Sequence, residues 1–172
     1  MDDDRVAFIP LDMVVFTVSD SRTLETDRSG ALLAERVVAA GHRLATREIG
    51  RDDLYEVRAR VAAWIADPAI QVVLVTGGTG FAGRDITPEA VRPLLDREVP
   101  GFGELFRSLS RQEIGVSAIQ SRAVAGLANA TLVCCLPGSP GACALAWDAI
   151  LREQLDARNR PCNFVSVLRP RG

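Results

Sequence analysis

Apolar runs alternate with amphipathic stretches along the 172 residues of the chain. Nearly unbroken apolar runs are typical of strands buried on both faces of a parallel sheet, and they occupy residues 13–18, 70–76 and 131–136. Between these runs, apolar positions at helical spacing predict helices over residues 29–40, 54–65, 102–109 and 141–155. Weaker patterns predict two more strands, at residues 43–49 and 163–168.

This alternation predicts the fold class. We expect an α/β fold of three layers, in which helices cover both faces of a mostly parallel sheet. No internal repeat or linker divides the chain, so residues 1–172 are predicted to form a single domain, with residues 1–10 as a flexible tail.

Capping residues predict where two of the helices begin. Asp52 and Asp53 precede the helix at 54–65, where carboxylates satisfy the free N–H groups of a first turn. Thr87 is predicted to cap the helix that Pro88 opens, and Pro93 is expected to interrupt that helix one turn later.

Composition excludes several classes of function. The net charge is −2, which gives no basic surface for nucleic acid and no polybasic membrane patch. Every basic residue is Arg, so no Walker lysine or Schiff-base lysine is possible, and a phosphate must be held by Arg, backbone N–H groups or a metal. The single His42 excludes a zinc site with several His ligands, and its place after Gly41 predicts a solvated turn residue.

The cysteines favour a reducing compartment. Cys134 and Cys135 are adjacent on a predicted strand, so their side chains are expected on opposite faces, as buried thiols rather than a redox pair. No C-x-x-C pair, signal peptide or apolar run of about 18 residues is present, and the expected location is cytoplasmic.

Three of the predicted strands end in unusual loops, at residues 17–20, 76–80 and 136–140. Ligands of parallel α/β sheets bind beyond the carboxyl ends of the strands, so these loops are expected to face one crevice. The glycines at 77, 78 and 80 would let backbone N–H groups approach a phosphate, although an ordinary tight turn has the same composition. The turn lacks the G-x-G-x-x-G spacing, which disfavours a nicotinamide-dependent enzyme.

Two carboxylates and one hydroxyl lie beside these loops. Asp85 follows the glycine turn and is a candidate Mg²⁺ ligand, because Mg²⁺ takes one or two carboxylates together with substrate phosphates. Asp52 either caps the following helix or, if Asp53 caps it, helps to position Mg²⁺ or a reacting phosphate. Ser139 either caps the helix that follows it or contributes to an anion site.

Five segments together resemble a known family: TGGTGFAGRDITPE, REVPGFGELFR, SRAVAG, LPGSPGA and LDARNRPCNF, at residues 76–89, 97–107, 121–126, 136–142 and 155–164. They are similar to the molybdenum cofactor biosynthesis protein B family, whose relatives include the molybdopterin adenylyltransferases and a domain of gephyrin. The resemblance covers about residues 14–164 and implies a molybdopterin-binding α/β domain.

The resemblance also implies an activity. Active members use Mg²⁺ to transfer AMP from ATP to the terminal phosphate of molybdopterin, and they release pyrophosphate. Asp52 and Asp85 match the catalytic and metal-binding positions. The ligand-binding positions implied are Thr17 and Ser19 on the nucleotide side, Gly78, Thr79 and Gly80 on the phosphate turn, and Ser121, Gly138 and Ser139 along the crevice.

Two implications of the resemblance remain open. The family often has Asn where this chain has Ser139, and some protein B members have lost adenylyl transfer, so the alternative is a catalytically inactive paralogue that binds molybdopterin or a nucleotide. Members form homotrimers or homohexamers. The apolar stripe of Phe102, Leu105, Phe106 and Leu109 is therefore either core or subunit interface.

Overall fold

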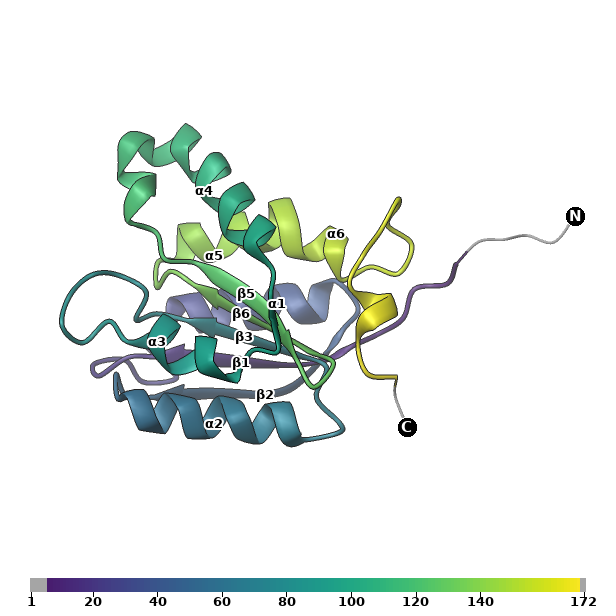
Figure 1. The fold of residues 1–172 in the computed structure, drawn as a ribbon, viewed down its shortest axis with the longest axis horizontal. Helices are drawn as coiled ribbons and strands as arrows, with labels where there is room; N and C mark the ends of the chain where they lie inside the picture. The colour runs from purple at the N-terminus through teal and green to yellow at the C-terminus, as the bar shows by residue number, and fades with distance from the viewer. Residues whose placement is uncertain (1–5, 171–172) are drawn as a thin grey trace, which may run out of the picture.

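The computed structural model describes residues 6–170 and contains one six-stranded sheet. In spatial order its strands are β2 (Arg43–Gly50), β1 (Asp12–Val18), β3 (Val72–Thr76), β6 (Thr131–Leu136), β5 (Val124–Ala128) and β4 (Arg97–Glu98). The first four strands run parallel, and the last two pairings are antiparallel. The predicted α/β class with a mostly parallel sheet is confirmed (Figure 1).

Helices cover both faces of this sheet, as predicted. The helices on one face are α1 (Arg28–Ala39), α4 (Pro100–Ile114) and α5 (Pro140–Ala146), and those on the other face are α2 (Leu54–Ala66) and α3 (Thr87–Val91). Figure 1 shows α2 below the sheet, with α4 and α5 above it. The helix of α5 continues through a π-helical segment, η3 (Trp147–Leu151), into α6 (Arg152–Gln154). The remaining short helices are η1 (Arg92–Leu94), η2 (Gly115–Gln120) and η4 (Val165–Val167).

The apolar runs form the central strands because both faces of these strands are buried. Successive side chains of a strand point to opposite faces, so Leu74 and Cys134 pack under α1, α4 and α5, whereas Val73 and Cys135 pack under α2 and α3. The adjacent thiols therefore lie on opposite faces and are fully buried, as predicted.

Three sequence-based interpretations are resolved by the packing. Asp53 caps α2, because its Oδ1 accepts the N–H groups of Tyr55 at 3.0 Å and Glu56 at 2.8 Å. The stripe on α4 is mostly core, since Phe102 and Phe106 are buried, although Leu105 is 47% exposed. Pro93 lies in η1, where α3 has already ended, so the predicted interruption is confirmed.

The prediction for Thr87 is wrong. Thr87 is the first residue of α3 rather than its cap, and its buried hydroxyl donates to the carbonyl of Gly77 at 2.7 Å. A tertiary contact thus takes the hydroxyl that a cap would have used.

The prediction for His42 is also wrong, because His42 is only 5% exposed. Its Nδ1 accepts the N–H of Leu11 at 3.2 Å, and its ring lies 5.1 Å from that of Phe8 and 6.3 Å from that of Trp147. Burial lowers the pKa of His42 to about 4, so the ring is neutral near pH 7.

Residues 163–168 do not form the predicted edge strand. They contain η4, and just before it the Oδ1 of Asn163 accepts the N–H of Val165 at 3.0 Å and closes a local turn. The antiparallel strands β4 and β5 were not predicted. β5 is only five residues of Val, Ala, Gly and Leu, and it lacks the long apolar run of a central strand.

Two further predictions concern the N-terminal tail and the absence of a membrane-spanning segment. Residues 1–5, half of the predicted flexible tail, lie outside the described residues, and Phe8 packs against His42. Across residues 6–170, no helix has the length and apolar composition needed to cross a membrane.

Candidate functional site

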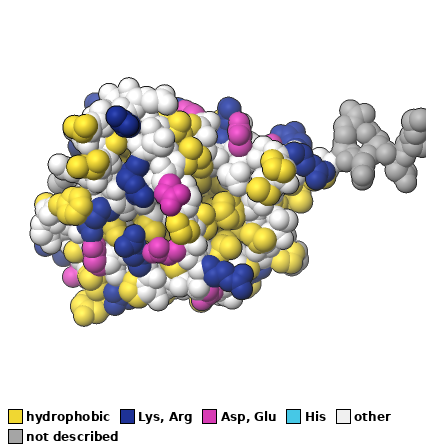
Figure 2. Space-filling model, turned by 45° about the horizontal axis from the view of Figure 1, so that its top comes forward, with side chains coloured by type: hydrophobic (Ala, Val, Ile, Leu, Met, Phe, Trp, Pro, Cys, Tyr) yellow, Lys and Arg dark blue, Asp and Glu magenta, His cyan; other side chains and the backbone are white. Residues whose placement is uncertain are grey.

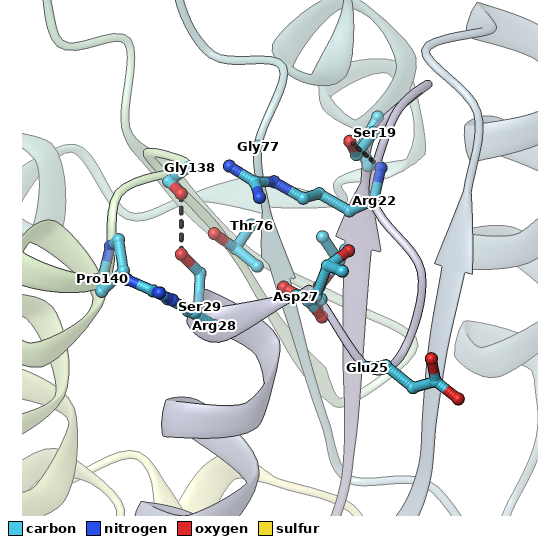
Figure 3. A pocket seen from close by; sticks show the side chains of 13 residues that line it. Ser19, Arg22, Glu25, Asp27, Arg28, Ser29, Thr76, Gly77, Gly138 and Pro140 are labelled. Atoms are coloured by element: carbon cyan, nitrogen blue, oxygen red, sulfur yellow. Dashed lines mark hydrogen bonds between the residues drawn. The ribbon is translucent and has the colours of Figure 1, made fainter.

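A cavity of about 720 Å³ opens at the carboxyl ends of β1, β3 and β6. Its lining includes Thr17 near the end of β1, Ser19 directly after β1, Gly77 after β3, and Gly138 after β6 (Figure 3). The three strand-end loops that the sequence pattern placed together therefore do face one crevice.

The buried carboxylate of Asp27 orders the wall of this cavity nearest α1. Asp27 caps α1 by accepting the N–H of Gly30 at 2.9 Å, and it also accepts the hydroxyl of Thr17 at 2.8 Å. Arg47 balances its charge at 3.1 Å. Ser29 donates to the carbonyl of Gly138 at 2.7 Å, which fastens α1 to the loop after β6 (Figure 3).

Arg22 supplies positive charge to the same cavity. Figure 3 shows its side chain extending across the opening toward Gly77, whereas Glu25 points away. The hydroxyl of Ser19 accepts the backbone N–H of Arg22 at 3.1 Å and so orders the loop that carries the guanidinium.

The glycine turn lets the ends of β1 and β3 approach each other. Gly77 has φ +98° and Gly78 has φ +66°, conformations that L side chains rarely adopt. A Cβ on Gly77 would overlap the carbonyl oxygen of Val18. The turn is closed by the N–H of Thr87, which donates to Gly78 at 2.9 Å.

Asp52 and Asp85 lie against this turn from two different loops. A Cβ on Gly78 would stand 3.3 Å from Asp52 Oδ1, and a Cβ on Gly80 would stand 2.6 Å from Asp85 Oδ2. Asp85 Oδ2 accepts the N–H of Ala82 at 2.9 Å, which holds this carboxylate beside the turn. Neither carboxylate lines the 720 Å³ cavity, which meets the glycine turn at Gly77.

Negative charge accumulates around Asp52. Burial, followed by the charges of Asp20 and, more weakly, Asp85, raises the pKa of Asp52 above its ordinary value. Arg84 forms an ion pair with Asp20, and that hydrogen bond lowers the pKa of Asp20. A second cation near Asp52 and Asp85 would relieve the remaining repulsion.

The residues present fit a site for a divalent cation whose remaining ligands are phosphate oxygens of a substrate. Among residues 6–170, no group of three or more His, Cys, Asp or Glu side chains is arranged to hold a metal without other ligands. Asp52 and Asp85 supply two carboxylates, which is the usual protein share of a Mg²⁺ site on a phosphate substrate.

The other predicted residues are placed as follows. Thr79 is buried within the glycine turn. The Oγ of Ser139 accepts the N–H of Ala142 at 3.2 Å and caps α5. Ser121 directly follows η2, in the loop before β5, and lies outside the lining of the cavity. The structure therefore brings most of the predicted residues to two adjoining areas, the cavity and the carboxylate-flanked turn, and leaves Ser121 at their margin.

Several residues of the site were not predicted. Asp27 could have been found from its position immediately before a helical stripe, where a cap belongs. Arg22 carries no such signal, because it is one of 20 arginines in the chain.

Comparison with known proteins identifies the class of this domain. Residues 14–157 match the family model described as "Probable molybdopterin binding domain". Together with the α/β sheet and the strand-end crevice, this match over most of the chain places the protein in the molybdopterin-binding domain family.

More similar relatives define the branch. The chain is 54% identical over 157 residues to molybdenum cofactor biosynthesis protein B of Escherichia coli (strain K12), covering 91% of this chain and 92% of that protein. It is 46% identical over 142 residues to the protein of the same name from Bacillus subtilis (strain 168), covering 82% and 84%. The chain belongs to the molybdenum cofactor biosynthesis protein B family.

Solved structures agree with this assignment. A crystal structure of molybdenum cofactor biosynthesis protein B matches with a TM-score of 0.84 and 44% identity, covering 87% of this chain and 94% of that one. The tungsten cofactor synthesizing protein MoaB from Pyrococcus furiosus matches with a TM-score of 0.74 and 34% identity, covering 82% and 90%.

Proposed function

We propose that this protein binds molybdopterin and transfers AMP to its terminal phosphate from ATP, with Mg²⁺ as the cofactor. The observation that carries the proposal is the placement of Asp52 and Asp85, from separate loops, against one glycine turn. The names of the relatives, which refer to biosynthesis of a molybdenum cofactor, support molybdopterin as the second ligand.

The reaction joins two anions. A terminal phosphate oxygen of molybdopterin attacks the α-phosphorus of ATP, a new P–O bond forms, and the bond from the α-phosphorus to the bridging oxygen breaks so that pyrophosphate leaves with its electron pair. Mg²⁺ supplies charge neutralisation for the phosphates when it is bound by Asp52 and Asp85.

The chain itself supplies alignment. Thr17, Ser19 and Gly138 line the cavity of about 720 Å³, a volume suited to a nucleotide or a pterin. Gly78, Thr79 and Gly80 bring backbone N–H groups close to the phosphates without a lysine. Catalysis would come from positioning and electrostatic stabilisation rather than from a protein nucleophile.

We also propose that the protein assembles as a homotrimer or homohexamer. Apolar side chains are exposed where α4 passes into η2, with Ile114, Val116 and Ile119 at 55%, 78% and 80% exposure. Such a surface is costly to leave in water and is suited to contact between subunits. Sedimentation equilibrium would test this, and a monomer at micromolar concentration would contradict it.

The function is tested by incubating the protein with molybdopterin, Mg²⁺ and ATP labelled at the α-phosphate. We expect labelled pterin from the wild type, and a loss of at least about 100-fold for Asp85→Asn and Asp52→Asn. Asp53→Asn is the matched control, because Asn also caps helices and Asp53 holds α2 rather than the turn. If the wild type binds molybdopterin but forms no labelled product, the protein is instead an inactive binding paralogue.

A further inference from the structure

One guanidinium group holds the loop that follows the glycine turn. Arg122, in the loop between η2 and β5, donates from Nε to the carbonyls of Gly80 at 2.9 Å and Thr79 at 3.3 Å, and from Nη2 to the carbonyl of Asp85 at 2.8 Å. Its Nη1 pairs with Glu89 in α3. All three nitrogens of one side chain are therefore bonded to a segment that lies at least 33 residues away in the sequence.

An aromatic ring also lies over this guanidinium. The carbon atom at the centre of the guanidinium lies 5.2 Å from the ring centroid of Phe81, a residue of the loop itself, and the side chain of Arg122 is only 21% exposed. Phe81 is 70% exposed, so its ring adds little to the core of the protein. A cation–π contact of this kind favours the same closed position of the loop.

These bonds set the direction of the peptide groups in the loop. In a trans peptide the C=O and the next N–H point in opposite directions. Because Arg122 binds the carbonyls of Thr79, Gly80 and Asp85, the N–H groups of the residues that follow them must point away from the guanidinium. Those N–H groups, of Gly80, Phe81 and Ile86, have no hydrogen-bond partner within the described part of the chain.

We propose that Arg122 is a positioning residue for the phosphate-binding turn. It draws three loop carbonyls to one side and thereby leaves three N–H groups free for an anion on the other, and it holds the backbone that carries Asp85. Arg122 acts through the backbone, with its own charge already satisfied by Glu89 and the three carbonyls. This inference rests on the proposed function, since the anion it serves is the phosphate of ATP or of molybdopterin.

The guanidinium is suited to this role because it is planar and offers five N–H donors in a fixed arrangement. Lysine would keep the charge but, as a compact ammonium group, could not hold both ends of the loop in one geometry. Arg122→Lys therefore keeps the charge but loses the fixed arrangement of donors, whereas Arg122→Gln loses both.

The experiment measures the affinity of Mg-ATP by calorimetry for the wild type, Arg122→Gln and Arg122→Lys. The matched control is Arg107→Gln, because Arg107 also bonds carbonyls at the entrance to β5, those of Ser121 and Ala123 at 3.4 Å, but does not bond the loop. The unfolding midpoint in urea and the rate of trypsin cleavage after Arg84, without ligand, are measured on the same samples.

We expect Arg122→Gln to bind Mg-ATP at least about tenfold more weakly and to be cleaved faster after Arg84, with an unfolding midpoint close to that of Arg107→Gln. Arg122→Lys should lie between the wild type and Arg122→Gln, and it decides the test if Arg122→Gln does not fold.

Equal affinity of the wild type and the Arg122 variants would overturn the inference while leaving the proposed function intact. An equal loss in Arg107→Gln would also overturn it, because the effect would then belong to the entrance of β5 in general. If the wild type does not bind Mg-ATP, the proposed function fails and the inference fails with it.

Discussion

A single added methyl group at Gly80 tests whether Asp85 is held where the structure places it. The Cβ of Gly80→Ala would stand 2.6 Å from Asp85 Oδ2, about 0.8 Å short of an ordinary 3.4 Å contact. The carboxylate is the movable partner, so it must shift or rotate by roughly that amount. Its hydrogen bond from Ala82, now 2.9 Å, would be lost or stretched.

The expected energies separate stability from activity. Loss of a hydrogen bond at the surface costs about 1 kcal/mol, and replacing glycine by alanine at a position with a permitted φ returns about 0.4–1 kcal/mol through the unfolded chain. The free energy of unfolding should therefore change by less than about 1 kcal/mol. A displacement of about 1 Å in a reacting group can lower the rate about 100-fold, so adenylyl transfer should fall by about 10- to 100-fold.

The assay compares Gly80→Ala with Gly83→Ala, which lies in the same loop and whose Cβ would meet no atom within 4 Å. Urea denaturation gives the stability, and transfer of labelled AMP gives the activity. We expect Gly83→Ala to match the wild type in both measurements. Wild-type activity in Gly80→Ala, or an equal loss in both variants, would refute the placement of Asp85.

Three further predictions concern the stability and chemistry of the fold. Gly77→Ala should lower the free energy of unfolding by about 2–4 kcal/mol in urea, because φ is +98° and the methyl group overlaps backbone; a change below 1 kcal/mol would contradict the close approach of β1 and β3. The free energy of unfolding should fall by up to about 3 kcal/mol between pH 6.5 and pH 4. Over this range His42 becomes protonated in the unfolded chain, whereas in the native state, where its pKa is about 4, it stays largely neutral. His42→Gln should remove most of that fall above pH 4.5, and an unchanged profile would argue against a buried neutral ring. In the native protein Cys162 alone should react with a thiol reagent, since burial raises the pKa of the other three thiols; rapid reaction of a second thiol would contradict this.

The central sheet could be predicted because its strands are encoded locally. The runs at β1, β3 and β6 are apolar at almost every position, which only burial on both faces explains. β5 carries no such run, and Gly126 stands in it because a Cβ there would stand 2.7 Å from the carbonyl of Arg97 in β4. That requirement arises from the neighbouring strand, so the five residues of β5 do not reveal it.

The same distinction holds for the site. Its loops could be predicted from glycines and carboxylates at strand ends, and Asp52 was freed for another role once Asp53 proved to cap α2. The burial of His42 and the hydrogen bonds of Arg122 could not be predicted, because they depend on partners 31 to 43 residues away.

The face in Figure 2 carries Arg, Asp and Glu side chains intermingled, consistent with the absence of a basic footprint in the composition.

The convergence of Asp52 and Asp85 on one cation can be measured directly with Mn²⁺ in place of Mg²⁺. In nuclear magnetic resonance spectra of the protein with ATP, added Mn²⁺ broadens signals of nuclei near the bound ion. We predict strong broadening of the amide signals of Asp52, Gly78, Gly80 and Asp85, which Asp52→Asn and Asp85→Asn each weaken. Unbroadened signals at these four residues, with broadening elsewhere in the protein, would contradict the account.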